Sequence, residues 1–407
     1  MEEIKKEIIE KVILVAVADQ DVREAEESLD ELEELVKTAG AVVAAREAPH
    51  PGTYIGKGKI DEVKALLYGT DAIGIVCDDE LSPAQMGNLS DVLDTKVMDR
   101  TLIILDIFAK RAFTREGKIQ VELAQLKYRA SKLTGQGKAL SRLGGGIGTR
   151  GPGEKKLEMD RRLIRTRISR LKAELRDVVK HREVQRKQRQ KNHLPVVCIV
   201  GYTNAGKSTL LNHFTNAGVY EEDQLFATLD PTTKSLDLSG GQTILMTDTV
   251  GFIRKLPHHL VEAFKSTLEE AKYSDLILHV VDASNPQKEK QMEAVYETLK
   301  QLDANESPIV TAFNKIDLLN GDEILKDQNA EAVVRISGKT GEGTDQLLEN
   351  IEKILQKQKL YLEKLYDYQD AGKIQQIRAH GQLLKEEYRE DGIYVEAYIP
   401  KEILGNI

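Results

Sequence analysis

The order of apolar and polar positions divides the chain into regions of different periodicity. Over residues 11–105, apolar runs of strand length alternate with longer segments whose apolar positions recur every three or four residues. Such alternation predicts a small parallel sheet with helices packed over it. The expected strands cover residues 11–18, 41–48, 72–78 and 96–99, and the expected helices cover residues 22–38, 59–67, 83–93 and 102–109.

From about Gly117 onward the periodicity becomes helical. One apolar stripe with steps of four and three begins at Ile119, and a second follows a helix expected from Lys156 to about Lys191. Two stripes joined by one linker predict an antiparallel helical hairpin, whose second helix is roughly 50 Å long at about 1.5 Å per residue. The linker, residues 135–153, holds eight glycines and one proline and forms the expected tip.

The end of the chain has a weaker pattern. Residues 360–368 are expected to form a helix, residues 374–387 have a mixed apolar pattern, and residues 392–400 alternate like a strand. Together these segments predict a small C-terminal α/β module.

Composition indicates a chain of two to three domains, with 407 residues of which 41% are hydrophobic. The charged N-terminus, Met-Glu-Glu-Ile-Lys-Lys, lacks the apolar stretch of a secretory signal, and the longest apolar runs are too short to span a bilayer. Cys77 and Cys198 lie in apolar strand patterns and are expected to be reduced core residues. We therefore expect a cytoplasmic protein without membrane insertion, acting as a monomer.

Charge is distributed unevenly along the chain. Residues 110–191 contain 25 Lys or Arg and 8 Asp or Glu, a net charge of +17, whereas the remaining residues carry −25. A solvated helical face would have mixed signs, so this excess favours a polyanionic partner. Aromatic residues are sparse here, which favours contact with RNA phosphates or RNA shape over base stacking. The candidate RNA-binding residues at the tip are Arg142, Arg150, Lys155 and Lys156.

A phosphate-binding motif follows the apolar run 194–200. Gly201 and Gly206 frame the pattern G-x-x-x-x-G-K-[ST], which ends in Lys207 and Ser208. The glycines allow backbone N–H groups to surround phosphates, the lysine reaches the β- and γ-oxygens, and the serine hydroxyl binds Mg²⁺. The segment therefore predicts a nucleoside triphosphate site.

A second motif predicts which base is bound. The expected strand 308–313 ends in Asn314-Lys315-Ile316-Asp317, the pattern N-K-x-D. The Asp317 carboxylate can accept hydrogen bonds from N1–H and the 2-amino group of guanine, and adenine offers no such pair of donors. Open α/β sheets bind ligands at the carboxyl ends of their strands, where this motif is expected.

Metal-binding and sensor elements lie between these two motifs. Asp248 and Gly251 form D-x-x-G, in which the carboxylate is expected to hold Mg²⁺ through water and the glycine N–H to contact the γ-phosphate. Thr228 is the expected second hydroxyl ligand of Mg²⁺, with Thr232 and Thr233 as neighbours of the same chemistry. The later segment 335–339 closes a strand where backbone N–H groups could meet the guanine O6.

These elements predict a GTPase with Mg²⁺ as its cofactor. The catalytic residues are expected to be Lys207, Thr228 and Gly251, and the metal ligands Ser208 and Thr228, with Asp248 acting through water. The predicted GTP-binding residues are Gly201, Tyr202, Thr203, Asn204, Ala205, Gly206, Lys207, Ser208, Thr209, Phe226, Ala227, Thr228, Leu229, Asp230, Asp248, Thr249, Val250, Gly251, Asn314, Lys315, Ile316, Asp317, Ser337, Gly338 and Lys339.

The predicted fold class is α/β with four parts. An N-terminal parallel α/β domain covers residues 1–108 and a basic helical hairpin covers residues 109–193. A P-loop GTPase domain covers residues 194–357, and a small C-terminal domain covers residues 358–407.

The motifs together resemble the HflX family of ribosome-associated GTPases. The resemblance rests on Gly-Tyr-Thr-Asn-Ala-Gly-Lys-Ser-Thr, Leu-Phe-Ala-Thr-Leu-Asp-Pro-Thr-Thr, Asp-Thr-Val-Gly-Phe-Ile and, upstream, Leu-Gly-Gly-Gly-Ile-Gly-Thr-Arg-Gly-Pro-Gly-Glu, and it covers nearly the whole chain. Two departures are Gly338, where the family usually has Ala, and Lys155-Lys156, where it usually has Thr-Gln. Asn204 resembles the residue that helps to hold K⁺ in related GTPases.

The resemblance implies a partner and a task. The partner would be the large ribosomal subunit and its rRNA, with the hairpin tip near the peptidyl-transferase region, and the GTP-bound state would separate or rescue stalled ribosomes. Two alternatives remain. One is a GTP-gated protein-binding switch without RNA contact, which the charge of the hairpin disfavours. The other is an ATP-dependent RNA chaperone or helicase using the N-terminal domain, which the lack of a second P-loop disfavours.

Overall fold

The computed structural model describes residues 10–17, 22–47, 54–141, 152–191, 194–215, 225–226, 229–239, 242–255, 260, 270–304, 307–319, 321, 323–400 and 404. The chain forms two compact units. The first comprises Met1–Val178, Gln224–Phe226 and Lys255–Phe264, and the second comprises Val179–Asp223, Ala227–Arg254 and Lys265–Ile407.

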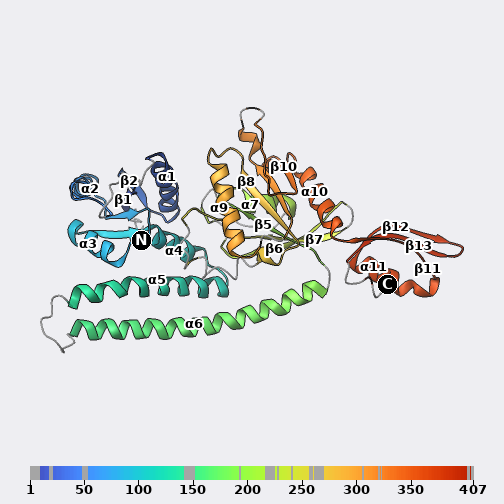
Figure 1. Cartoon of the computed structure of the whole chain (residues 1–407), viewed down its shortest axis with the longest axis horizontal. Coiled ribbons are helices and arrows are strands. Elements are labelled where there is room, and N and C mark those ends of the chain that lie inside the picture. Colours follow the sequence, from blue (N-terminus) through green and yellow to red (C-terminus); the bar gives the residue numbers. More distant parts are fainter. Residues whose placement is uncertain are drawn as a thin grey trace, which may run out of the picture. The chain divides into compact units, whose positions relative to one another are not determined.

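The first unit contains a four-stranded parallel sheet with the order β2-β1-β3-β4 and helices on its faces (Figure 1). Its elements are β1 (Lys11–Val15), α1 (Val22–Thr38), β2 (Val42–Glu47), α2 (Lys57–Thr70), β3 (Gly74–Cys77), α3 (Pro83–Leu93), β4 (Lys96–Asp99) and α4 (Arg100–Arg111). All eight predicted elements are present. Helix α4 begins two residues before its predicted start because the Asp99 carboxylate caps it, accepting a hydrogen bond from the Leu102 N–H at 3.0 Å.

The helical hairpin consists of α5 (Arg115–Ser141) and α6 (Pro152–Lys191). The helices run antiparallel, since Arg167 of α6 pairs with Glu122 of α5 at 2.7 Å and Arg161 donates to the Leu133 carbonyl at 2.7 Å. Ile119, Leu123 and Leu171 form the centre of their shared apolar seam. The hairpin is therefore as its two apolar stripes predicted.

The connection between the two helices is shorter than predicted. Helix α5 continues through Gly135 and Gly137 to Ser141, so the connection covers residues 142–151 instead of 135–153. A glycine in a helix interior lowers helix stability by only about 1 kcal/mol relative to alanine. The helix-forming residues around Gly135 and Gly137 can offset this cost. Pro152 opens α6, where its missing N–H costs no helical hydrogen bond.

The second unit contains a six-stranded sheet with the order β10-β9-β8-β5-β7-β6, in which only β6 runs antiparallel to its neighbour. Its elements are β5 (Val196–Gly201), α7 (Lys207–Thr215), β6 (Thr232–Asp237), β7 (Thr243–Asp248), β8 (Leu276–Asp282), α9 (Lys288–Gln301), β9 (Ile309–Asn314), η1 (Ile316–Leu318), β10 (Ala332–Arg335) and α10 (Thr344–Lys357).

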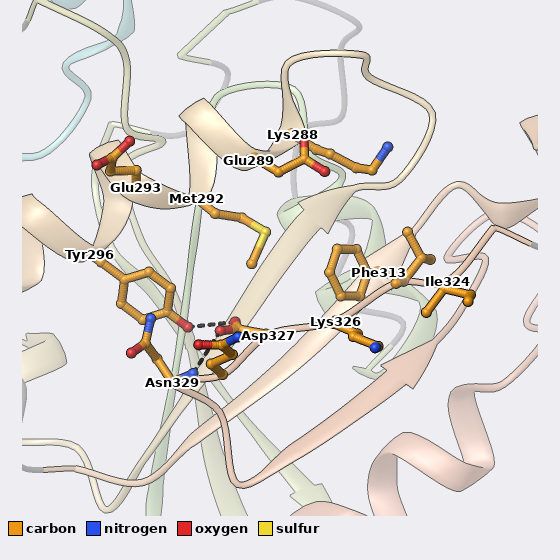
Figure 2. A pocket seen from close by; sticks show the side chains of 12 residues that line it. Lys288, Glu289, Met292, Glu293, Tyr296, Phe313, Ile324, Lys326, Asp327 and Asn329 are labelled. Atoms are coloured by element: carbon orange, nitrogen blue, oxygen red, sulfur yellow. Dashed lines mark hydrogen bonds between the residues drawn. The ribbon is translucent and has the colours of Figure 1, made fainter.

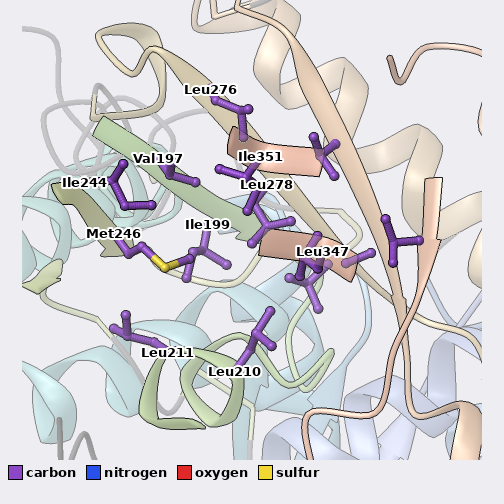
Figure 3. Close-up of a cluster of buried hydrophobic side chains, with 14 of the residues drawn as sticks. Val197, Ile199, Leu210, Leu211, Ile244, Met246, Leu276, Leu278, Leu347 and Ile351 are labelled. Atoms are coloured by element: carbon purple, nitrogen blue, oxygen red, sulfur yellow. The ribbon is translucent and has the colours of Figure 1, made fainter. Parts of the chain in front are cut away.

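Helices cover both faces of this sheet. On one face, side chains of β5, β7 and β8 pack against Leu210 and Leu211 of α7 and against Leu347 and Ile351 of α10 (Figure 3). On the other face, Phe313 of β9 lies in a smaller apolar cluster with the partly buried Met292 of α9. The parallel strands therefore carry their loops to one shared edge, where the predicted motifs lie.

A C-terminal module completes the second unit. It contains an antiparallel sheet with the order β11-β13-β12 and one helix. Its elements are β11 (Leu360–Tyr366), η2 (Tyr368–Asp370), α11 (Ala371–His380), β12 (Gln382–Arg389) and β13 (Gly392–Ile399). The Gln382 side chain donates to Glu352 of α10 at 2.8 Å, which links the module to the preceding domain.

One secondary-structure prediction was wrong, because residues 360–368 were expected to be helical and instead contain β11. This strand pairs with β13 from Leu360 opposite Ile399 to Tyr366 opposite Ile393. Leu360, Leu362 and Tyr366, at even spacing, pack against the module's core, so pairing and burial decide the local structure.

Candidate nucleotide and metal site

The P-loop connects β5 to α7. Two of its positions, Gly201 and Gly206, have a backbone conformation and close neighbours that only glycine accommodates. Gly201 has φ +155°, and a Cβ there would lie 2.2 Å from the Val280 carbonyl oxygen. Gly206 has φ +90°, and its Cβ would lie 2.3 Å from Asn314 Nδ2. The loop ends at the N-terminus of α7, where free N–H groups and the helix dipole favour a phosphate.

Lys207 is buried at the start of α7 and carries the cation of this site. Its ammonium donates to the Tyr202 carbonyl at 2.8 Å. Burial lowers the pKa of Lys207 to about 8, against the opposing effect of the Asp248 carboxylate. A desolvated ammonium at this position gains strongly from an anionic ligand, because the interaction takes place in a medium of low dielectric constant.

The predicted metal ligands Ser208 and Asp248 are adjacent. Ser208 Oγ donates to Asp248 Oδ2 at 2.7 Å, and β5 and β7, which position them, are paired parallel strands. A hydroxyl and a carboxylate oxygen are the donor types that Mg²⁺ prefers, with nucleotide phosphates and water completing the shell, so these residues fit the ion. Across the described ranges no cluster of three or more His, Cys, Asp or Glu is placed to hold a metal.

The second predicted hydroxyl ligand, Thr228, and its neighbour Ala227 lie outside the described residues. Of the two alternatives, Thr233 lies in β6 and its hydroxyl is 2.9 Å from that of Thr247 in β7. A hydroxyl that shares a hydrogen bond within the sheet is less suited to a mobile switch, so Thr228 stays the prediction.

The D-x-x-G glycine lies directly against the P-loop. A Cβ on Gly251 would be 2.9 Å from Lys207 Nζ and 2.9 Å from Thr203 Cγ2, so only glycine fits. Its N–H is thus close to the ammonium that is expected to bind the terminal phosphates. The next residue, Phe252, is 2% exposed and forms a short parallel bridge with Tyr202.

The base-recognition residues are held by hydrogen bonds to two loops. Asn314 donates to the Ala205 carbonyl at 2.8 Å and accepts from the Gly338 N–H at 2.8 Å, which fixes the P-loop relative to the base loop. The exposed carboxylate of Asp317 accepts from the Ser337 hydroxyl at 2.6 Å. This single bond orients Asp317 and leaves capacity for the donors of guanine.

Some residues of the site were not predicted. Asp282, at the end of β8, pairs with Lys315 at 2.7 Å and fixes the lysine stem. Its position after a buried strand was a usable signal, because the ends of parallel strands meet at one edge. The Tyr202 hydroxyl also accepts a hydrogen bond from the Arg254 N–H at 2.6 Å, and nothing in the sequence pattern indicated this contact.

The structure does not bring every predicted residue to this edge. Phe226 belongs to the first unit, where its ring packs edge-on against Phe108 with centroids 4.7 Å apart. At the hairpin, Arg142 and Arg150 lie outside the described residues. Lys155 and Lys156 lie on the backbone of α6, but their side chains are not described. The RNA-binding assignment therefore stays a prediction.

A hollow of about 400 Å³ lies between α9, β9 and residues 324–329 of the second unit (Figure 2). Met292 and Tyr296 of α9, Phe313 of β9 and Ile324 line it. Asp327 accepts hydrogen bonds there from Tyr296 and Thr311, both at 2.6 Å. No P-loop residue lines this hollow, so it is separate from the nucleotide site.

A mostly parallel sheet that carries a P-loop, D-x-x-G and N-K-x-D at one edge defines a P-loop GTPase. Three family models match consecutive parts of the chain: "GTP-binding GTPase N-terminal" at residues 26–109, "GTP-binding GTPase Middle Region" at residues 111–189 and "50S ribosome-binding GTPase" at residues 196–315.

Relatives of known name agree with these matches. The chain is 67% identical over 407 residues to GTPase HflX of Lacrimispora saccharolytica, covering 99% of this chain and 96% of that protein. It is 48% identical over 332 residues to GTPase HflX of Escherichia coli, covering 79% and 78%. The chain therefore belongs to the HflX family of GTPases, and its reaction is the hydrolysis of GTP.

Among solved structures, a GTP-binding protein of Sulfolobus solfataricus in complex with GDP aligns at 25% identity with a TM-score of 0.45, covering 85% of this chain and 99% of that chain. Within the described parts of the chain, no helix is both long and apolar enough to cross a membrane.

Proposed function

We propose that this GTPase binds the large ribosomal subunit and uses GTP binding and hydrolysis to separate, recycle or rescue ribosomes. The observation that carries the proposal is the net charge of +17 on residues 110–191, in a chain whose other residues carry −25. The printed description of the family model at residues 196–315, a 50S ribosome-binding GTPase, supports the same partner. Such a partner places the protein in the cytoplasm, where we expect a monomer to act.

The hairpin is suited to rRNA because its cations are displayed along a long helix. Among the α6 side chains that the structure describes, the exposed basic ones are Arg162, Arg165, Arg167, Arg170, Lys172, Arg176 and Lys180. Arg167 and Arg170 form exposed ion pairs with glutamates, which are weak in water and can exchange for phosphate contacts. Glycines around the tip would allow its four candidate cations to enter a narrow RNA channel.

In the nucleotide site, each residue has a chemical task. Lys207 would bind the β- and γ-phosphate oxygens, and Ser208, Thr228 and, through water, Asp248 would hold Mg²⁺, which would neutralise phosphate charge. Gly251 senses the γ-phosphate with its N–H, and Asp317 reads guanine. Phe252 stands directly after D-x-x-G, where many GTPases have a glutamine that orients water, so intrinsic turnover should be slow and the ribosome should accelerate it.

Co-sedimentation with purified large subunits tests the proposal, using a non-hydrolysable GTP analogue and, separately, GDP. We expect binding with the analogue that weakens steeply as salt rises, because phosphate contacts release counterions. Replacing Arg142, Arg150, Lys155 and Lys156 by alanine should weaken ribosome binding and leave GTP affinity intact.

The matched control removes the same charge from the GTPase domain, replacing the exposed Lys290, Lys300, Lys326 and Lys353 by alanine. This control should retain ribosome binding. A tip variant that binds and splits ribosomes like the wild type across the salt series would contradict the proposal and leave a GTP-gated protein-binding switch as the better explanation.

A further inference from the structure

The two faces of the C-terminal sheet differ in what covers them. On one face, the buried Val395 and Ala397 of β13 pack with Ile374 and Ile377 of α11. Side chains alternate along a strand, so the residues between these point to the opposite side. This opposite side, which we call the outer face, comprises Tyr361, Glu363 and Leu365 of β11, Tyr394, Glu396 and Tyr398 of β13, and Lys385, Glu387 and Arg389 of β12.

Two glutamates face each other on the outer face. Glu363 of β11 lies directly opposite Glu396 of β13 in the strand register. The Tyr394 hydroxyl contacts Oε1 of Glu363 at 2.7 Å and Oε1 of Glu396 at 2.8 Å, and its one proton serves one carboxylate at a time. Like charges directly opposite each other destabilise a sheet, so this arrangement favours a cationic partner.

A third glutamate of the same face has its charge neutralised within the chain. Glu387 lies 2.7 Å from Lys385 Nζ and 2.7 Å from Arg389 Nη2. Among the residues that the structure describes, no lysine or arginine lies within ion-pair distance of Glu363 or Glu396. The outer face therefore carries uncompensated negative charge where these two glutamates meet.

The tyrosine rings favour the same kind of ligand. The guanidinium carbon of Arg389 lies 3.9 Å from the centroid of the Tyr394 ring, and Lys385 Nζ lies 5.8 Å from it, so this ring already stacks with a cation of its own chain. Tyr361 is 52% exposed, and its ring contacts that of Tyr398 edge-on with centroids 5.5 Å apart. These two rings form an accessible aromatic surface beside the two glutamates.

The charges of the outer face decide between two kinds of partner. Exposed tyrosines on a sheet can stack with RNA bases, but the phosphates of RNA would meet three glutamates and only two cations, both already paired with Glu387. The whole module, residues 358–400, contains six Lys or Arg and eight Asp or Glu. A guanidinium, by contrast, binds carboxylates through its planar fork of donors and stacks on aromatic rings.

We propose that the outer face binds an arginine-containing segment of a partner protein. One guanidinium bridges Glu363 and Glu396, and neighbouring side chains of the segment lie against Tyr361 and Tyr398. This protein contact goes beyond the proposed ribosomal function. Its test contains no ribosomes, so the failure of either proposal leaves the other standing.

The test titrates the GDP-bound full chain with the synthetic peptide acetyl-Gly-Arg-Gly-Arg-Gly-Arg-amide and measures the heat of binding. Glu363→Gln removes one charge and keeps an acceptor for the Tyr394 hydroxyl, so the Kd of the peptide should rise about tenfold. Its thermal unfolding temperature should not fall, because repulsion with Glu396 is relieved. Tyr361→Leu should raise the Kd about fivefold, and Tyr361→Phe, which keeps the ring, should bind like the wild type.

Matched variants change the same residue types elsewhere. Glu349→Gln removes an exposed carboxylate of α10 that pairs with Lys353, and Tyr68→Leu removes a tyrosine of α2 that is 85% exposed. Both should bind the peptide like the wild type. A peptide with lysine in place of arginine should bind more weakly, because an ammonium lacks the planar fork. An oligouridine of about ten nucleotides should bind equally to the wild type and to Tyr361→Leu.

Four results would overturn the proposal. The first is a wild-type Kd in both Glu363→Gln and Tyr361→Leu. The second is an equal loss in Glu349→Gln and Tyr68→Leu, or equal binding of the lysine peptide, which would indicate general attraction to an acidic protein. The third is a lower unfolding temperature of Glu363→Gln, which would give the glutamate pair a structural role. The fourth is oligouridine binding that falls in Tyr361→Leu and rises in Glu363→Gln, which would make the outer face an RNA surface.

Discussion

The chain contains one parallel and one mostly parallel α/β sheet, and residues of opposite charge lie at the carboxyl ends of their strands. At the edge of the sheet containing β5, two glycines and Lys207 form a loop that approaches the neighbouring backbone closely. At the edge of the sheet containing β3 and β4, Asp78 and Asp99 are buried acids. The same layer architecture therefore serves a phosphate site in one case and an internal ionic network in the other, and the loop residues decide which.

The partners of the cations near the two edges show this difference. Arg100 pairs with Asp78 at 2.8 Å, and Lys132 lies 3.1 Å from Asp99, which also accepts from the Tyr128 hydroxyl at 2.9 Å. Lys207, among the described residues, has a backbone carbonyl as its partner and no carboxylate within ion-pair distance. A cation already neutralised supports folding, whereas one without a counter-ion is prepared for an anionic ligand.

The largest effect should come from breaking the ionic network at its centre. Arg100→Met leaves the buried Asp78 without its guanidinium, and we expect the free energy of unfolding to fall by about 3–5 kcal/mol. GTP affinity should be unchanged, because the nucleotide site lies in the second unit. Denaturant unfolding and nucleotide titration measure the two quantities. Lys37→Met, which removes exposed ion pairs, is the control and should unfold like the wild type.

The complementary change removes Lys207, the cation at the carboxyl edge of the sheet containing β5. Lys207→Met should weaken GTP binding by about 3 kcal/mol, roughly a hundredfold, because a charge-assisted contact to phosphate is lost. Lys132→Met deletes a partly buried lysine of α5 that pairs with Asp99 at the end of β4, and it should leave GTP affinity intact while lowering stability. Equal losses of GTP affinity in both variants would show that the two edges do not differ as their partners suggest.

Asp317 is a carboxylate that we propose to recognise the base, unlike Asp78, which lies in an internal ionic network. In Asp317→Asn, the Ser337 hydroxyl can still donate to the side-chain oxygen, so the loop should keep its structure. The amide reverses the donor and acceptor presented to the base, so GTP affinity should fall by about 2 kcal/mol while xanthosine triphosphate binding rises. Competition titrations measure both. Wild-type protein that binds ATP as tightly as GTP at this site would refute the recognition model.

The sequence predicted where the P-loop, D-x-x-G and N-K-x-D lie in the fold, because each motif has fixed spacing and follows a strand. Glycines at 201 and 206, the lysine at 207 and the N-K-x-D carboxylate could be placed from the chain alone. The ionic network could not, because Arg100, Asp78 and Lys255 are distant in sequence and meet only through tertiary structure. Residues 360–366 were misassigned for a related reason, since pairing with β13 outweighs local preference.

The lowered pKa of Lys207 makes nucleotide affinity depend on pH. Below about pH 8 the lysine is already protonated in the free protein, so GTP affinity should be independent of this group. Above pH 8 the free protein is deprotonated there and phosphate binding must take up a proton, so affinity should fall by up to about tenfold per pH unit. Titrations from pH 7 to 9.5 test this. In Lys207→Arg, the descent should be absent, because arginine stays protonated.

The smallest expected effect concerns monovalent cations at the same edge. Asn204 is exposed and has φ +60°, and it resembles the residue that helps to hold K⁺ in related GTPases. We expect K⁺ to stimulate hydrolysis over Na⁺ by a few-fold, about 1 kcal/mol in the barrier, and Asn204→Ala to lose this preference. Alanine is strained in a left-handed conformation, so Asn204→Gly, which removes the side chain and accepts that backbone, is the decisive variant. If the glycine variant keeps the K⁺ preference, or if the wild type hydrolyses GTP equally fast in the two salts, the cation is not held by this side chain.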